Sequence, residues 1–142
     1  MDQLFQLSNL LVIPFWVLMI SLPRWQWTQR IIGSHAIILP IALLYSVLVV
    51  PNFASILPDL ANPTLPVIQQ LLGSDAGATT AWIHFLAFDL WTGRWVFLDA
   101  QSAGIPVWGT SLVLIAVFMA GPFGLLLYLI LRWFFVRRQN VQ

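Results

Sequence analysis

Four long stretches of apolar residues, each with very few charges, divide the chain. They cover about residues 3–23, 31–50, 77–98 and 106–131. A helix needs about 20 mostly apolar residues to cross the hydrocarbon core of a bilayer, which is about 30 Å thick. The pattern therefore predicts an all-α fold: an integral membrane four-helix bundle that forms a single transmembrane domain over residues 1–142. An even number of spans places both termini on the same face of the membrane.

Three of the predicted spans contain a proline. Pro14, Pro40 and Pro122 fall inside predicted spans, and each predicts either a kink or a local widening of the bundle around a ligand, because proline lacks the N–H that a helix uses. The connection 51–77 contains further prolines, and within it Leu65–Leu72 is predicted to form a short surface helix.

Composition supports a membrane protein. The chain is 60% hydrophobic and only 8% charged, whereas soluble domains are about 25% charged. It has no cysteine, which excludes disulfides and thiolate metal sites, and its net charge of +1 is too small to predict a nucleic-acid partner. Asp2 stands where a secretory signal would carry positive charge, and no transit peptide is recognised. We therefore expect a mature or bacterial-type polypeptide.

The third apolar stretch carries three ionisable residues, His84, Asp89 and Arg94. Ionisable groups inside a span are costly and are candidates for function. At about 100° per residue these three side chains point in different directions. Either this helix lies at the centre of the bundle, or Thr92-Gly93 bends it.

Their depths follow from a rise of about 1.5 Å per residue. One group is deep: Asn9, His84 and Asp89. A second group is shallow: Arg24, Arg30, His35, Arg94 and Asp99. A lone carboxyl near the midplane is protonated or paired, and in either state Asp89 is a candidate acid or base. His84 is a proton carrier, a ligand or a partner in a helix–helix hydrogen bond. Arg94 either acts in the site, or extends to the interface and pairs with Asp99 or a lipid phosphate.

Aromatic residues are the remaining candidates for ligand binding. His84, Phe88, Trp91 and Trp95 share one face of the third helix, and Trp16 also lies deep. These rings either line a groove for a flat or rod-like lipid or pack in the core. The candidate ligand-binding residues are Asn9, Trp16, His35, Phe88, Trp91 and Trp95. His35 and His84 lie at different depths, which disfavours a haem held between them, and we expect no metal or redox cofactor.

Three segments carry a family resemblance: NLLVIPFW at 9–16 with LMI at 18–20, AFDL at 87–90 with GRW at 93–95, and GPFGLLLY at 121–128. In these segments, and in their order, the chain resembles the abscisic-acid-deficient-four-like family, as a cyanobacterial-type member. The family's plant member is linked to neoxanthin synthesis in plastids. The resemblance therefore implies carotenoid biosynthesis in a thylakoid or a bacterial inner membrane.

That resemblance implies an isomerase that converts a xanthophyll epoxide, violaxanthin, to the allenic alcohol neoxanthin. This conversion is redox-neutral and needs one acid and one base, so no cofactor is implied. On this reading Asp89 or His84 is the acid–base residue, and Arg94 orients the substrate or stabilises the developing oxyanion.

Two other interpretations remain open beside the isomerase. The chain could be a non-catalytic subunit that binds carotenoid or chlorophyll, or assists assembly, in a photosynthetic complex. A small transporter is less favoured, because the spans show no paired inverted halves. The expected partners are a carotenoid and membrane lipid, with self-association or docking to a photosynthetic complex compatible with so little extramembrane chain.

Overall fold

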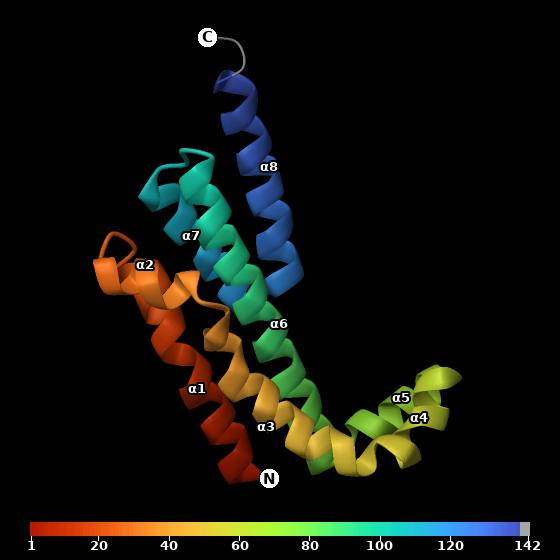
Figure 1. Ribbon diagram of the computed structural model, residues 1–142. Coiled ribbons are helices and arrows are strands. Elements are labelled where there is room, and N and C mark those ends of the chain that lie inside the picture. Colours follow the sequence, from red (N-terminus) through yellow and green to blue (C-terminus); the bar gives the residue numbers. More distant parts are fainter. Residues whose placement is uncertain (140–142) are drawn as a thin grey trace. The chain divides into compact units, whose positions relative to one another are not determined.

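The computed structural model describes residues 1–139, which fold almost entirely as α-helix. In chain order the helices are α1 (Asp2–Ser21), α2 (Gln26–Gly33), α3 (Leu39–Val49), α4 (Phe53–Ala61), α5 (Leu65–Leu72), α6 (Asp75–Ser102), α7 (Val107–Met119) and α8 (Gly121–Gln139) (Figure 1). Short 3-10 helices at His35–Ile38 and Val50–Asn52 lead into α3 and α4. The all-α prediction is confirmed, and the helix predicted at Leu65–Leu72 is α5.

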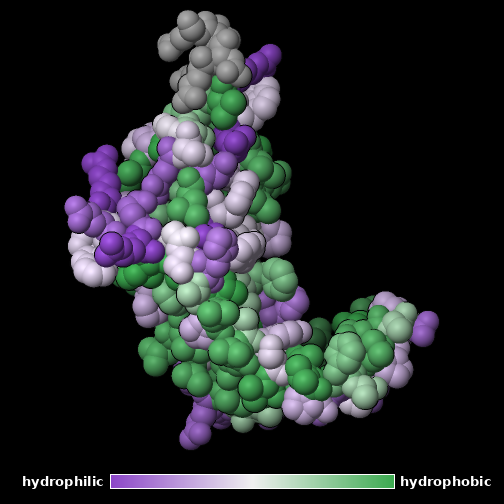
Figure 2. Space-filling view, in the orientation of Figure 1, coloured by the Kyte–Doolittle hydropathy of each residue, from purple (hydrophilic) through white to green (hydrophobic). Residues whose placement is uncertain are grey.

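Two described segments are long and apolar enough to cross a membrane: Asp2–Ser21 and His35–Ala61. The first corresponds to the span predicted at 3–23. On the face shown in Figure 2, hydrophobic side chains cover α3, whereas hydrophilic side chains gather over α2. The helix α6 contains the whole span predicted at 77–98, together with its ionisable residues.

The chain forms two compact units. Unit 1 consists of Met1–Val12 and Ile38–Ala87, and contains the first part of α1, helices α3 to α5 and the first part of α6. Unit 2 consists of Ile13–Ile37 and the chain from Phe88 onward, and contains the rest of α1, α2, the rest of α6, α7 and α8. Most of the candidate residues lie in unit 2.

Within unit 2, α8 runs parallel to α6. The start of α8 at Gly121 lies against Asp89, and further along Arg132 of α8 reaches Asp99 of α6. Helix α7 runs the opposite way to α8, because Gly124 lies against Val117. Figure 1 shows the chain turning between α7 and α8 and running back along itself.

The prediction of one span over 106–131 is therefore wrong: this stretch is two helices that meet at Ala120. The physical reason is Pro122, which has no N–H and so begins α8 where a single helix would have needed that bond. The prediction that both termini share a face assumed this single span. Because α6 and α8 run parallel, the shared face of the two termini no longer follows from the number of spans.

The other two prolines behave differently from each other. Pro40 stands in the first turn of α3, where its missing N–H costs nothing. The predicted stretch 31–50 is not one helix, because the helical structure is interrupted at Ser34, between α2 and the 3-10 helix His35–Ile38. Pro14 lies inside α1, which continues through it. Of these three prolines, only Pro14 lies well inside a helix, as expected of a kink-forming proline.

The turn between α6 and α7 positions the last part of α6. Gly104 has a φ of 65°, the left-handed conformation that favours glycine, and the N–H of Ile105 donates to the Ala100 carbonyl at 2.9 Å. This arrangement closes the C-terminal end of α6 and begins α7 in the reverse direction.

Candidate functional site

Arg94 of α6 is buried against the C-terminal end of α2. Its Nε donates to the Ile32 carbonyl at 2.8 Å and its Nη2 donates to the Gly33 carbonyl at 2.7 Å. The side chain is only 7% exposed. Because the last carbonyls of a helix have no partner within the helix and carry partial negative charge, they accept these bonds readily. Arg94 thus caps the C-terminal end of α2 with its positive charge. These two hydrogen bonds use two of its five N–H donors.

Two aromatic rings complete this part of unit 2. The Trp91 ring lies 5.4 Å from the Arg94 guanidinium, at cation–π distance, and the His35 ring lies 5.7 Å from Trp91. We call His35, Trp91 and Arg94 the Arg94 corner. His35 and Trp91 are exposed, so the corner is open on the side of these two rings. The sequence placed His35 and Arg94 in one shallow group, and the structure brings them together around Trp91.

A second polar cluster joins α6 to α8. The Asp99 carboxylate accepts hydrogen bonds from the Tyr128 hydroxyl and from Arg132, whose Nε lies 2.5 Å and whose Nη2 lies 3.3 Å from the carboxylate oxygens. The Trp95 ring meets Tyr128 edge-on at 5.3 Å. Asp99 therefore binds Arg132, not Arg94, and the predicted alternative of an Arg94–Asp99 pair is wrong.

Asp99 lies one residue beyond the predicted span. Partial burial raises the pKa of its carboxyl, but the hydrogen bonds from Arg132 and Tyr128 outweigh this effect and hold the pKa below its ordinary value. Asp99 is thus ionised at neutral pH, and the Tyr128 hydroxyl donates to a carboxylate.

Asp89 is half-buried and lies against the first residue of α8. A methyl group at Gly121 would collide with the Asp89 carboxylate, which shows how closely the two helices approach. In the part of the chain that the structure describes, no hydrogen bond or ion pair is found for this carboxylate. Unlike the Asp99 carboxylate, the oxygens of Asp89 therefore remain available to a ligand.

Trp16 belongs to the core of unit 2. It is 3% exposed, its ring covers Gly93 at the position where any larger residue would carry its Cβ, and it packs on Phe118 with ring centroids 5.2 Å apart. Of the two roles expected for Trp16, the structure favours core packing. Gly93 permits this close contact and does not interrupt α6, which remains one helix.

Exposed rings line one side of α6 instead. Phe88 is 60% exposed, Trp91 43% and Trp95 40%, and their spacing places them on one side of the helix. We call Phe88, Trp91 and Trp95 the aromatic stripe. Trp91 belongs to both the stripe and the Arg94 corner, so a rod-like apolar ligand along the stripe would meet polar groups there.

The remaining candidates lie in unit 1. The Asn9 amide donates to the Phe5 carbonyl at 2.9 Å and accepts a hydrogen bond from the Trp82 indole at 3.1 Å. The His84 ring lies 5.5 Å from Tyr45 of α3. Asn9 thus joins α1 to α6, which is a structural role. Within the described residues no three histidine or carboxylate side chains gather as metal ligands would.

Sequence reasoning did not select Tyr128 as a site residue. Its signal was indirect: Trp95 and Asp99 are four residues apart on α6, and Tyr128 and Arg132 are four apart on α8, so each pair shares a helix face. Only the parallel course of the two helices brings these faces together.

Comparison with known proteins adds one finding. A family model described as ABA DEFICIENT 4-like matches residues 3–128, a range that includes the Arg94 corner, Asp89 and Tyr128. No curated protein and no solved structure matches the chain.

Proposed function

Because the chain belongs to the ABA DEFICIENT 4-like family, a family of carotenoid-related membrane proteins, we propose that it is a xanthophyll isomerase of the neoxanthin-synthase type. The observation that carries the proposal is the aromatic stripe beside the Arg94 corner. A carotenoid is a long polyene with polar end groups. The stripe offers rings to the polyene, and the corner offers donors to an oxygenated end ring.

The reaction needs one proton delivered and one removed. The epoxide C–O bond breaks as its oxygen gains a proton, and loss of a proton from the neighbouring vinylic carbon forms the second double bond of the allene. We assign the proton transfer to Asp89, whose carboxylate has no bond to another described side chain, with His84 as the alternative. Arg94 stabilises the negative charge that develops on the oxygen, through the N–H groups that α2 does not use.

Carotenoid conversion by the intact protein tests this assignment. We would express the chain with a violaxanthin supply and analyse the pigments by chromatography. The intact protein should yield an allenic product, and Asp89→Asn should retain pigment and fold but lose conversion. Asp59→Asn, an exposed carboxylate in α4, is the matched control and should convert normally. Conversion that survives in Asp89→Asn would refute the role of Asp89.

A second candidate function is pigment binding without catalysis. The exposure of the aromatic stripe favours it, because a ligand there lies on the surface of unit 2. Such a protein would serve in a photosynthetic membrane, either a thylakoid or a bacterial inner membrane, as a homo-oligomer or within a larger complex. In that case bound carotenoid would be recovered unchanged, and Asp89→Asn would have no effect.

A further inference from the structure

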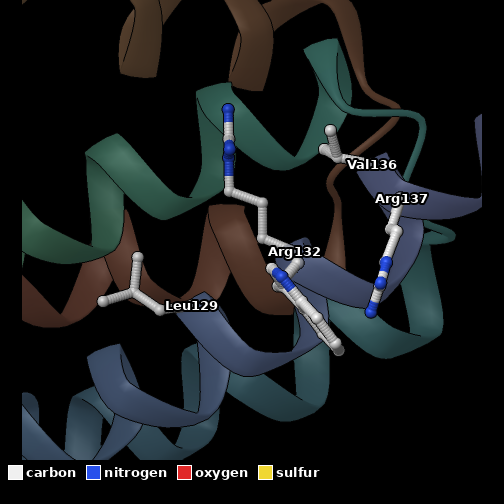
Figure 3. A pocket seen from close by; sticks show the side chains of 5 residues that line it. Leu129, Arg132, Val136 and Arg137 are labelled. Carbon is white, nitrogen blue, oxygen red and sulfur yellow. The ribbon is translucent and has the colours of Figure 1, made fainter. Parts of the chain in front are cut away.

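One face of α8, beyond the residues that the family model matches, forms an open hollow of about 580 Å³. It is lined by Leu129, Arg132, Trp133, Val136 and Arg137 (Figure 3). Figure 3 shows the side chains of Arg132 and Arg137 extending in different directions. The lining therefore combines apolar side chains with two guanidinium groups.

The two arginines differ in their partners. The Nε and Nη2 of Arg132 donate hydrogen bonds to the Asp99 carboxylate, which balances the charge of the arginine. Only the remaining N–H groups of Arg132 are available to a ligand. Arg137 lies over the Trp133 ring at 4.9 Å, and no carboxylate among the described residues pairs with it. The hollow thus keeps the positive charge of Arg137 without an anion to balance it.

We propose that this hollow binds the phosphate group of an anionic phospholipid. Arginine suits phosphate because its planar N–H groups match the phosphate oxygens. Tryptophan and arginine together are typical of the membrane interface, where lipid headgroups lie. Leu129 and Val136 supply an apolar surface for the lipid's glycerol and upper acyl chains, which a free phosphate ion would not need. The site is separate from Asp89 and the aromatic stripe, so it stands or falls independently of the isomerase proposal.

Binding of a short-chain phosphatidylglycerol to the detergent-purified protein tests the proposal. Titration calorimetry would compare this lipid with phosphatidylcholine of the same chain length and with inorganic phosphate. The variant Arg137→Gln removes the unbalanced charge, and Arg137→Lys keeps it. Arg30→Gln is the matched control, because Arg30 also lies over a tryptophan, Trp27, at 5.7 Å, but does not line this hollow. Thermal unfolding of each variant checks that the fold is retained.

We expect phosphatidylglycerol to bind more tightly than either alternative, and its affinity to fall about fivefold in Arg137→Gln. Arg137→Lys should keep most of the affinity, and Arg30→Gln should match the unmodified protein. Equal losses in Arg137→Gln and Arg30→Gln would overturn the proposal in favour of general charge attraction. Inorganic phosphate that binds as tightly as the lipid would overturn the assignment to a lipid. An unchanged affinity in Arg137→Gln would exclude the hollow.

Discussion

The Nε of Arg94 donates a hydrogen bond to the Ile32 carbonyl at 2.8 Å, which joins α6 to the C-terminal end of α2. A second bond to the Gly33 carbonyl makes the guanidinium a cap for α2. The charge that we assign to catalysis is therefore also part of the framework of unit 2.

Replacing Arg94 should destabilise the protein. In Arg94→Gln the shorter side chain cannot reach both carbonyls, and losing hydrogen bonds from a charged donor costs about 2–3 kcal/mol. Unfolding in detergent, followed by circular dichroism, measures the loss. Arg30→Gln, at an exposed position on α2, should change the free energy of unfolding by less than about 0.5 kcal/mol. Equal stability of the two variants would show that the cap contributes nothing.

The hairpin of α7 and α8 should depend on Gly124. A methyl group there would overlap the backbone of Val117 and Ala116, which cannot move as a side-chain tip can. Gly124→Ala should therefore cost about 1–3 kcal/mol through forced separation of the helices. Gly109→Ala in α7 is the control, because its methyl would meet only ordinary contacts of 3.7 Å or more. A tolerated Gly124→Ala would mean that the two helices are further apart than described.

How much of this fold is predictable depends on the length of each apolar run and on what ends it. The helices α1, α5 and α6 were predicted because their apolar or amphipathic stretches end at prolines, polar residues or glycine. The break at Ala120 was not, because the apolar stretch continues on both sides of it and Pro122 is also compatible with a kinked span. The close approach of Gly124 to Val117 favours two separate helices over one kinked span, and hydropathy does not encode this contact.

The candidate site was predictable to a similar extent. Arg94 and Asp89 stand out because charges in an apolar stretch are expensive. Their partners could not be read from spacing: Arg94 bonds backbone carbonyls, which every residue has, and Asp99 bonds side chains of α8, whose direction was predicted wrongly.

The direction of α8 makes a prediction about membrane topology. Helix α7 runs antiparallel to α1, as the Ser111–Ile20 and Trp16–Phe118 contacts show, so α8 runs parallel to α1. The C-terminal ends of α1 and α8 should then face the same side of the membrane. Because the chain has no cysteine, single cysteines at Pro23 and Arg137 can be labelled with an impermeant maleimide in oriented vesicles. We expect both to label from one side. Labelling from opposite sides would restore the four-span topology.

The hydrogen bond between Tyr128 and Asp99 should give a measurable coupling free energy between the two side chains. Tyr128→Phe removes a buried donor to a carboxylate and should cost about 1.5–3 kcal/mol, much of which disappears when Asp99 is already replaced by Asn. Since the folded pKa of Asp99 is held below its unfolded value of about 3.9, its stabilisation is present above that value and is lost as pH falls through the folded pKa. The coupling should therefore be constant between about pH 5 and pH 8, as double-mutant cycles at both values can establish. A coupling that falls already near pH 6 would contradict an ionised Asp99.

The aromatic stripe should set the affinity for carotenoid. Trp91 is exposed on α6 and its ring also faces Arg94 and His35, so it is the position where a polyene and an oxygenated end ring would meet. Trp91→Leu keeps an apolar side chain but removes the ring, and should weaken carotenoid binding roughly three- to tenfold. The control is Trp108→Leu in α7, which changes an exposed tryptophan outside the stripe. Titration of carotenoid against tryptophan fluorescence, corrected for the tryptophan removed in each variant, gives both affinities. If Trp108→Leu weakens binding as much as Trp91→Leu, the ligand responds to general surface hydrophobicity, and the stripe is not its site.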